Sequence, residues 1–556
     1  MRAVHTMQTV ALLLLLSACG GGGASDSAAS DPAPVTPGTP ATPTTPTTPT
    51  TPASPVADIS TVVAMDPGSS LPANWRDGPF AEIYVRAYRD SNGDGIGDFK
   101  GLTQSLDYLK ALGVTGIWLM PVTASQDRDH GYAVQDYRAL ETDYGSLADF
   151  DELLREAHSR GIGVIVDYVI NHSAAQNPMF VNAKSGADAQ FRSWYIWSST
   201  KPTGWNIYGN NPWYAAGNAY YFAGFWDQMP DFNLRNADVM AYHQSSMRYW
   251  LNRGVDGFRF DAAGNLVENG PQAWEGQPEN YTIMGNVKTM VGGYASRYMV
   301  CEAPIDPKGF STACGSAFAF GHNYDIVSAA KGSSSAVQAV ADYFKTAPAG
   351  MATMVSNHDS FAGQRLYDQV AGNLAQYRLA AATYLLQPGV PFIYYGEEIG
   401  MAGASSLSGD WKLRTPMSWT ASTSNAGFTT GAPFRAVSGN VAQFNVAAQQ
   451  NDTQSLLAYY TRLIALRRDE PALARGNYGD VVVNGSVMSF ARRLNGTSIR
   501  VVINYGTQAS SVQLGNLAAN GSITPIYPAA GAAQQADAAG KLQIAAPAQS
   551  VQVFRE

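Results

Sequence analysis

The chain has 556 residues, with 36 Lys or Arg against 44 Asp or Glu, which gives a formal net charge of −8. Nucleic-acid-binding proteins usually carry a basic surplus, so this balance argues against that class. Hydrophobic residues make up 45% of the chain and charged residues 14%, a composition that can bury a large core. The aromatic share of 11% suits a sugar-like ligand, although aromatic residues usually lie in cores.

The first residues predict an export signal. Arg2 precedes an apolar run at 10–16, which Leu-Ser-Ala-Cys closes at Cys19. A run this short predicts a signal peptide, here over 1–18, and not a membrane anchor. The residues before Cys19 resemble the lipobox of bacterial lipoproteins, in which the cysteine is lipidated, and Gly20 then favours the outer membrane. We therefore expect an exported protein, lipid-anchored in the outer membrane on its periplasmic or cell-surface face; an ordinary signal peptide cut nearby, giving a secreted protein, is the alternative.

A linker rich in Gly, Pro and Thr is expected over 19–60. Its stretch 32–55 has proline at every third position from Pro34 onward, which matches the three-residue turn of polyproline II. Such a segment acts as a semi-rigid spacer that would lift the folded body off a membrane. A docking site for a proline-recognition domain is the alternative.

From about residue 80, β-rich runs alternate with amphipathic helical runs. The candidate strands are 81–87, 116–120, 163–168, 257–261, 297–302, 317–320, 352–356 and 390–395, and clear helical periods occur at 102–112, 147–160 and 239–253. Alternation of this kind predicts parallel strands, and eight of them predict an α/β fold of the (β/α)8 TIM-barrel class. A doubly wound open sheet is the alternative.

Two segments depart from the alternation, which leaves 61–172 and 234–476 for the barrel. Residues 173–233 are rich in Asn, Gly, Trp and Tyr and lack a helical period, which indicates a subdomain inserted after strand 3. Residues 477–556 contain short alternating runs, which predict a C-terminal antiparallel β-sandwich domain.

Ionisable residues gather where the predicted strands end, and active sites of such barrels lie at that edge. They are Asp167, Asn171 and His172 after the third strand, Arg259 and Asp261 at the fourth, Glu302 at the fifth, and His358 and Asp359 at the seventh. A single strand-end Asp often only caps a helix, but four carboxylates at four strand ends converge on one mouth. Arg259 and Asp261 are two residues apart, so on a strand they share a face, and the guanidinium favours the ionised carboxylate.

These segments resemble the α-amylase family, family 13 of the glycoside hydrolases. The similarity rests on four segments in the family's order, which are Asp-Tyr-Val-Ile-Asn-His at 167–172, Gly-Phe-Arg-Phe-Asp-Ala at 257–262, Glu302 after Val-Cys, and Ser-Asn-His-Asp at 356–359. His-Gly-Tyr at 130–132 and Met-Pro-Asp-Phe-Asn-Leu at 229–234 add two more.

The resemblance implies a role for each matched residue. Asp261 would be the nucleophile, Glu302 the general acid and base, and Asp359 the carboxylate that stabilises the transition state. Five residues would line the subsite that holds the sugar ring under attack: His130, Tyr132, His172, Arg259 and His358. Retaining cleavage needs one ionised and one protonated carboxyl, and we expect Arg259 to hold Asp261 ionised while neighbouring negative charge keeps the proton on Glu302.

A calcium ion is the expected cofactor. The run after the first strand places oxygen ligands at alternating positions, as at the start of an EF-hand-type loop. Its ligands would be Asp90, Asn92, Asp94, Ile96 and Asp98, and the run also resembles a calcium loop of amylase relatives that include oligo-1,6-glucosidases. Gly101 occupies the twelfth position, where an EF-hand has a bidentate Glu, so either the affinity is modest or another segment completes the shell. A polar turn that caps the next helix is the alternative.

The expected activity is retaining endo-hydrolysis of α-1,4 bonds in starch-like glucans and maltooligosaccharides. Many α-amylases have Lys-His where this chain has Gly264 and Asn265, which leaves the leaving-group side open. The alternatives within the family are an α-1,6-glucosidase, a cyclomaltodextrinase or neopullulanase, and a glucosyltransferase. A non-catalytic glucan-binding lipoprotein on the same fold is a further alternative, but the intact set of Asp261, Glu302 and Asp359 argues against it. An α-glucan is thus the expected partner, and we expect a monomer.

The cysteines predict one disulfide. If Cys19 carries lipid, Cys301 and Cys314 remain as a pair in an oxidising compartment. A buried free thiol is the alternative, because unpaired Cys is among the most buried residue types.

Overall fold

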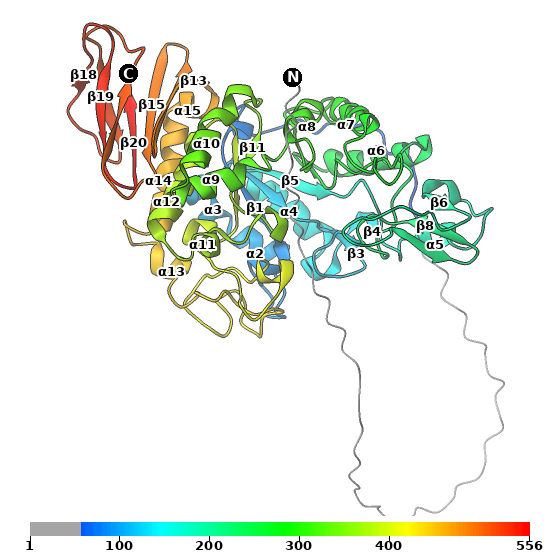
Figure 1. The fold of residues 1–556 in the computed structure, drawn as a ribbon. Helices are drawn as coiled ribbons and strands as arrows, with labels where there is room; N and C mark the ends of the chain where they lie inside the picture. The colour runs from blue at the N-terminus through cyan, green and yellow to red at the C-terminus, as the bar shows by residue number, and fades with distance from the viewer. Residues whose placement is uncertain (1–56) are drawn as a thin grey trace, which may run out of the picture. The chain divides into compact units, whose positions relative to one another are not determined.

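The computed structural model describes residues 57–556, so the predicted signal peptide, Cys19 and nearly all of the linker lie outside the described residues. The barrel strands are β1 (Phe80–Ile83), β2 (Gly116–Leu119), β5 (Gly163–Tyr168), β9 (Gly257–Phe260), β10 (Tyr298–Cys301), β11 (Ala352–Thr353) and β12 (Val390–Tyr394) (Figure 1). They pair in the order β10-β9-β5-β2-β1-β12-β11. Ala317 and Phe318 bridge to β10 and β11 and complete the ring, so the predicted barrel is confirmed.

Most of the expected strands keep their length or are one or two residues shorter than predicted, but three of the eight differ more in where they run. The strand expected at 81–87 ends at Ile83, where its register with Leu119 of β2 also ends, and the chain turns into helix α1 (Val85–Tyr88). The strand expected at 317–320 contributes only the two bridging residues, and the one expected at 352–356 only the two of β11. Without further ladder partners, these segments leave the sheet and form the loops above the barrel.

Aromatic side chains fill the inside of the barrel. Phe80, Trp118 and Phe392 belong to one fully buried cluster. Gly116 makes room for this packing, since a Cβ there would lie only 2.3 Å from the ring of Phe80. The barrel is therefore a packed core, and its chemistry is confined to one rim.

Helices surround the strands. Their bounds are α2 (Phe99–Gln104), α3 (Leu106–Leu112), α4 (Leu147–Ser159), α6 (Ala237–Asn252), α7 (Pro278–Val291), α8 (Pro307–Cys314), α9 (His322–Ala330), α10 (Ser334–Thr346), α11 (Leu366–Gln369), α12 (Leu374–Leu386), α13 (Val446–Gln449), α14 (Leu456–Asp469) and α15 (Pro471–Arg475). Helix α4 shows why they form where they do, because Ser146 and Asp149 make a reciprocal capping box at its start. Its apolar face, with Phe150 and Leu153, is buried. Among residues 57–556, no helix is long and apolar enough to cross a membrane.

Two small substructures are inserted between strands of the barrel. A hairpin that the sequence did not predict, β3 (Thr123–Ser125) and β4 (Val134–Leu140), follows β2. Between β5 and β9, helix α5 (Pro178–Ala183) and strands β6 (Trp197–Ser198), β7 (Trp213–Ala216) and β8 (Ala219–Phe222) form the inserted segment, with the sheet order β6-β8-β7. A bridge between His172 and Asp231 ties the two ends of this insertion together at the barrel rim.

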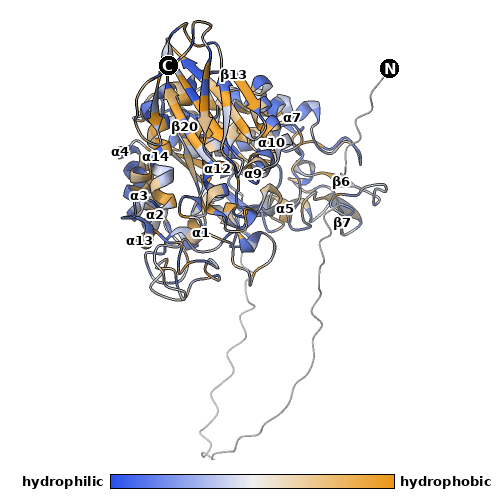
Figure 2. Cartoon of the chain, turned by 60° about the vertical axis from the view of Figure 1, so that its left-hand side comes forward, coloured by the Kyte–Doolittle hydropathy of each residue, from blue (hydrophilic) through white to orange (hydrophobic). Residues whose placement is uncertain are grey.

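The C-terminal part is an antiparallel β domain, as predicted. Its strands are β13 (Asn477–Asn484), β14 (Val487–Leu494), β15 (Thr497–Asn504), β16 (Ser510–Leu514), β17 (Ser522–Tyr527), β18 (Gln534–Gln535), β19 (Leu542–Ala546) and β20 (Ser550–Arg555). Six of them form one sheet, and β16 pairs with β19. Apolar and polar residues alternate along these strands (Figure 2), and Val502, Val512 and Ile544 belong to one buried cluster between the sheets.

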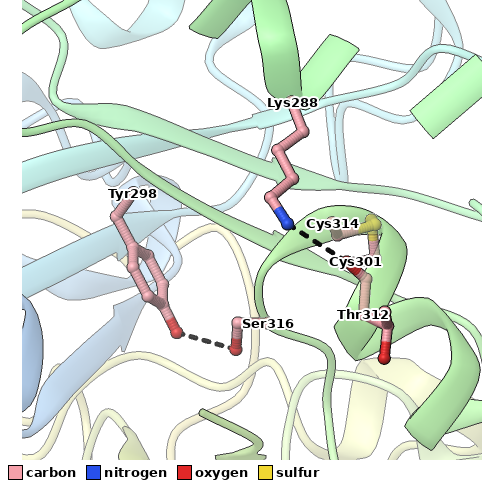
Figure 3. Close-up of a disulfide and its surroundings, with 6 residues drawn as sticks. All are labelled: Lys288, Tyr298, Cys301, Thr312, Cys314 and Ser316. Atoms are coloured by element: carbon pink, nitrogen blue, oxygen red, sulfur yellow. Dashed lines mark hydrogen bonds between the residues drawn. A yellow bond between two sulfur atoms is a disulfide. The ribbon is translucent and has the colours of Figure 1, made fainter. Parts of the chain in front are cut away.

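A disulfide joins Cys301 to Cys314 (Figure 3), with a Cα–Cα distance of 6.2 Å. Cys301 ends β10 and directly precedes Glu302, whereas Cys314 ends α8. Lys288 of α7 donates a hydrogen bond of 3.1 Å to the carbonyl of Thr312 on the same helix as Cys314. The bridge thus ties the strand that carries Glu302 to its outer helix layer.

Candidate active site

A fully buried arginine organises the rim. Arg259 lies on β9, and its Nη1 donates hydrogen bonds of 2.9 Å to both carboxylate oxygens of Asp167 and to Oδ1 of Asp261. Its Nη2 forms an ion pair with Glu302, one residue beyond β10. One guanidinium therefore lies between Asp261 and Glu302 and holds both at the carboxyl ends of adjacent strands.

The third predicted carboxylate, Asp359, lies in a second ion cluster. His358 Nε2 is 3.1 Å from Asp359 Oδ2, and His358 Nδ1 is 2.6 Å from Glu82 Oε1. Arg414 Nη2 donates to Asp359 Oδ1 at 2.7 Å. Two cationic side chains therefore face Asp359, one on each carboxylate oxygen.

Tyr132 connects the two clusters. Its hydroxyl donates to Asp167 at 2.9 Å, accepts from Arg259 at 3.2 Å and lies 2.7 Å from His358 Nε2. His130 lies beside the Tyr132 ring, with the two ring centroids 5.6 Å apart. All the predicted rim residues other than Asn171 and His172 thus lie in one chain of direct contacts; the Asn171 amide instead donates a hydrogen bond of 2.9 Å to Asp231.

His172 lies at the edge of this group, against Phe225, with ring centroids 5.5 Å apart. Burial lowers its pKa to about 3, so the imidazole is neutral. Its Nε2 is buried and makes no hydrogen bond within residues 57–556. Such a nitrogen can bond a ligand hydroxyl without first giving up a protein partner.

Burial and charge give the three carboxyl groups different proton affinities. Burial raises the pKa of Glu302 to about 7, with Asp261 and Asp359 adding to the rise, and burial raises the pKa of Asp261 to about 6 although Arg259 opposes it. Burial also opposes the ionisation of Asp359, but His358 and Arg414 hold its pKa well below the usual range. Near neutral pH, Glu302 therefore holds a proton more readily than Asp261, and Asp359 is ionised.

The possible metal ligands in the loop from Asp90 to Asp98 are all oxygen atoms. Asp90 accepts hydrogen bonds from the N–H groups of Asn92, Gly93 and Gly95 at 2.7–2.9 Å, and Asp98 caps helix α2. Each carboxylate has about four lone-pair positions, so these bonds leave room for a cation. Within residues 57–556, no three His, Cys, Asp or Glu side chains gather closely enough to hold a metal. The Asn92 amide and the Ile96 carbonyl would therefore have to supply the remaining ligands.

Sequence reasoning missed two residues of the site. Glu82 lies inside β1 and is 1% exposed, and a charged residue within the apolar run Phe-Ala-Glu-Ile was a usable signal for it. Arg414 comes from the irregular segment after β12, where no local pattern marks it. Only the fold brings it to Asp359.

Two carboxyl groups of different proton affinity at adjacent strand ends of a parallel barrel are the arrangement that a glycoside hydrolase uses. The family model described as "Alpha amylase, catalytic domain" matches residues 82–476. The chain therefore belongs to the α-amylase family.

The relatives differ in the activities that their names give. Alpha-amylase 3 of Dictyoglomus thermophilum is 31% identical over 457 residues, covering 80% of this chain and 87% of the relative. Oligo-1,6-glucosidase of Parageobacillus thermoglucosidasius is 29% identical over 519 residues, covering 79% and 92%. The crystal structure of an α-amylase from H. orenii superposes with a TM-score of 0.74 at 30% identity, covering 86% and 99%.

The cluster around His358 predicts a pH-dependent stability. Burial opposes its protonation, but Asp359 and Glu82 outweigh this and raise the pKa of His358 to about 10. A raised pKa stabilises the fold fully below the unfolded value of about 6.5, and this contribution is lost as the pH rises through about 10. His358→Asn should therefore lower the melting temperature by on the order of 5 °C at pH 6, and the deficit should shrink towards pH 10.

His322→Asn is the matched control. His322 is also buried, but its pKa is lowered to about 3 by burial, so it is neutral over this whole range. Its deficit should not change between about pH 6 and pH 10. If the loss of melting temperature in His358→Asn is also the same at pH 6 and pH 10, His358 is not charged in the folded protein and the prediction is wrong.

Proposed function

We propose that this enzyme is a retaining endo-hydrolase of α-1,4-glucosidic bonds in starch-like α-glucans and maltooligosaccharides. The observation that carries the proposal is the buried Arg259, which holds Asp261 and Glu302 by its two terminal nitrogens. Hydrolysis with retention requires two carboxyl groups of opposite protonation on either side of one bond.

In the first step, Asp261 attacks the anomeric carbon and Glu302 gives its proton to the glycosidic oxygen. The bond to the leaving sugar breaks, and a glycosyl ester forms on Asp261. The pKa order of the two groups suits these roles, since the base must be ionised and the acid protonated near neutral pH. In the second step, Glu302 takes a proton from water, which displaces Asp261 and restores the α configuration.

The remaining rim residues would bind the ring as it distorts. Asp359 is held ionised and can accept hydrogen bonds from ring hydroxyls that strengthen in the transition state. His358 and His172 can donate hydrogen bonds to hydroxyls, and Tyr132 and His130 can pack against the sugar. A glycosyl unit in this place would touch all three carboxylates.

Substitution of the two carboxyls should separate their roles. Glu302→Gln should lower the rate on maltooligosaccharides by about 10²- to 10⁴-fold. On α-glucosyl fluoride, whose leaving group needs no proton, it should still release a burst of about one fluoride per enzyme, because Asp261 is intact. Asp261→Asn should show no burst.

Fluoride release followed in the first turnovers, with circular dichroism to confirm folding, makes this comparison. Proton NMR of the first product should show the α anomer. Near-normal rates of either variant, or a β anomer from the wild type, would contradict the mechanism.

Bond preference is the finer part of the proposal. A polymer-cleaving α-1,4 enzyme suits a tethered protein, because large glucans cannot cross the cell envelope. The named activity of the oligo-1,6-glucosidase relative keeps α-1,6 cleavage as the second candidate, with cyclodextrin opening and glucosyl transfer behind it. Product analysis on soluble starch, pullulan and cyclodextrin, over time, distinguishes these four outcomes.

We also propose a structural calcium ion at the loop from Asp90 to Asp98, supported by its oxygen donors. A ligand bound only by the folded state stabilises by mass action, by about 2.7 kcal/mol at a hundredfold excess over Kd. Chelation should therefore lower the melting temperature by several degrees, and added calcium should restore it.

Asp90→Asn should abolish this response, because it removes the carboxylate that organises the loop. Elemental analysis of the purified protein gives an independent readout. An unchanged melting temperature after exhaustive chelation, with no metal detected, would contradict the site.

Export and lipid anchoring at Cys19 are a further part of the proposal, supported by the sequence alone. Cys19→Ser should move the protein from the membrane fraction to the soluble fraction, because that thiol would be the acyl acceptor. Fractionation with an activity assay measures the change, and unchanged membrane association would refute lipidation as the anchor.

A further inference from the structure

The inserted segment carries an exposed aromatic residue at a strained turn. Tyr208 is 71% exposed and has a φ of 49°, followed by Gly209 with a φ of 89°. Ile207 and Asn210 exchange backbone hydrogen bonds of 2.8 and 2.9 Å around them, which makes this a two-residue turn. Such turns favour Asn, Asp or Gly, and a bulky residue with positive φ is a strained outlier. Folding alone does not explain a tyrosine here.

A second loop fixes this ring in place. Tyr208 contacts Trp274 edge to face, with ring centroids 5.9 Å apart and an angle of 89° between the rings. Trp274 lies in the loop 264–277 after β9, whose ends are joined by a hydrogen bond of 2.7 Å from Gly276 to Gly264. Trp274 also packs against the small core of the inserted segment around Trp213. Tyr208 is thus fixed where the insertion meets the barrel.

An exposed aliphatic residue lies against the same loop. Ile305 is 48% exposed and lies three residues after Glu302. A Cβ at Gly264 would lie 3.0 Å from Ile305 Cγ2, and a Cβ at Gly276 would lie 3.2 Å from Ile305 Cγ1. The side chain is therefore seated over two glycines that leave it room.

The loop that carries Trp274, the partner of Tyr208, lies on the side of Glu302. The N–H of Ala263, directly before this loop, donates a hydrogen bond of 2.9 Å to the carbonyl of Glu302, and Ile305 lies against Gly264 and Gly276 of the loop. The residues proposed to bind the ring under attack, Tyr132 and Asp359, belong instead to the cluster around His358. Because the proton donor stands next to the departing oxygen, Tyr208 belongs to the leaving-group side.

We propose that Tyr208, braced by Trp274, and Ile305 form the surface that binds the sugar unit on the leaving-group side of the cleaved bond. We call this set of residues the leaving-group surface. Its assignment rests on the proposed glucan hydrolysis. An aromatic ring and a branched aliphatic chain match the apolar C–H face of a glucosyl unit. Binding energy from this remote unit lowers the barrier only for substrates that have it, so the surface selects oligosaccharides over glucosides with small leaving groups.

Tyr208→Asn tests the surface, because Asn tolerates positive φ and removes only the ring. On maltotetraose, kcat/KM should fall about tenfold, corresponding to about 1.4 kcal/mol. On α-glucosyl fluoride, whose leaving group is a single ion, kcat/KM should stay within about twofold. The melting temperature should be unchanged or higher, since the strain is relieved. Tyr208→Phe should keep most of the activity, and Ile305→Ser should lose activity with the same selectivity.

Tyr249→Ala, at an aromatic residue on the outer helix α6, is the matched control and should change neither rate. An equal loss on both substrates would overturn the proposal, because Tyr208 would then act through the fold or the other subsite. An unchanged rate on maltotetraose would overturn it too. If the wild type cleaves the fluoride but no glucan, the proposed function fails and the surface fails with it. If the wild type cleaves glucans, either contrary result for Tyr208→Asn rejects the surface alone and leaves the proposed function standing.

Discussion

The active site depends on one buried charge. Arg259 is fully buried, and a guanidinium in such a place is stable only if anions and hydrogen-bond acceptors surround it. Asp167 and Asp261 supply the anions, and Glu302 supplies a further acceptor oxygen, from the ends of three neighbouring strands. The arrangement that neutralises the arginine is therefore also the arrangement that brings the proposed nucleophile, Asp261, and the proposed acid, Glu302, together. Loss of Arg259 would leave buried carboxylates without a cation, so geometry and stability are linked here.

The positions of the cationic side chains determine which of the carboxyl groups keep a proton. Asp359 has His358 on one oxygen and Arg414 on the other, and it stays ionised. Asp261 and Glu302 share Arg259 with Asp167, so the single positive charge cannot compensate three buried carboxylates. Burial then raises the pKa values of both groups, and Glu302, with Asp261 and Asp359 as its negative neighbours, keeps the proton most readily. Sequence reasoning expected Arg259 to hold Asp261 ionised and did not consider burial; burial raises the pKa of Asp261 to about 6, so this carboxyl is still mostly ionised near neutral pH.

The barrel and most of its rim could be predicted because each strand, and the polar residues after it, leave a pattern within a short stretch of the sequence. A strand such as β5 begins with the apolar run Gly-Val-Ile-Val, and Asp167 near its end, with the polar residues that follow, marks where it stops. The exact strand lengths could not be predicted, since a strand ends where its neighbour ends, as Ile83 does beside Leu119. Arg414 and the pairing of Tyr208 with Trp274 could not be predicted either, because each joins segments far apart in the chain that only the closed barrel brings together.

The two sides of the cleft are built from different parts of the molecule. The residues around the ring under attack come from strand ends and the segments that directly follow them, whose positions the barrel fixes. Tyr208 and Trp274 come from the inserted segment and a long loop, and loops tolerate change that strands do not. Leaving-group recognition can therefore vary while the acid, the base and Arg259 stay in place. If the proposed leaving-group surface is correct, the determinants of bond preference would lie in the loops beside Glu302, which is compatible with relatives named as an α-amylase and an oligo-1,6-glucosidase.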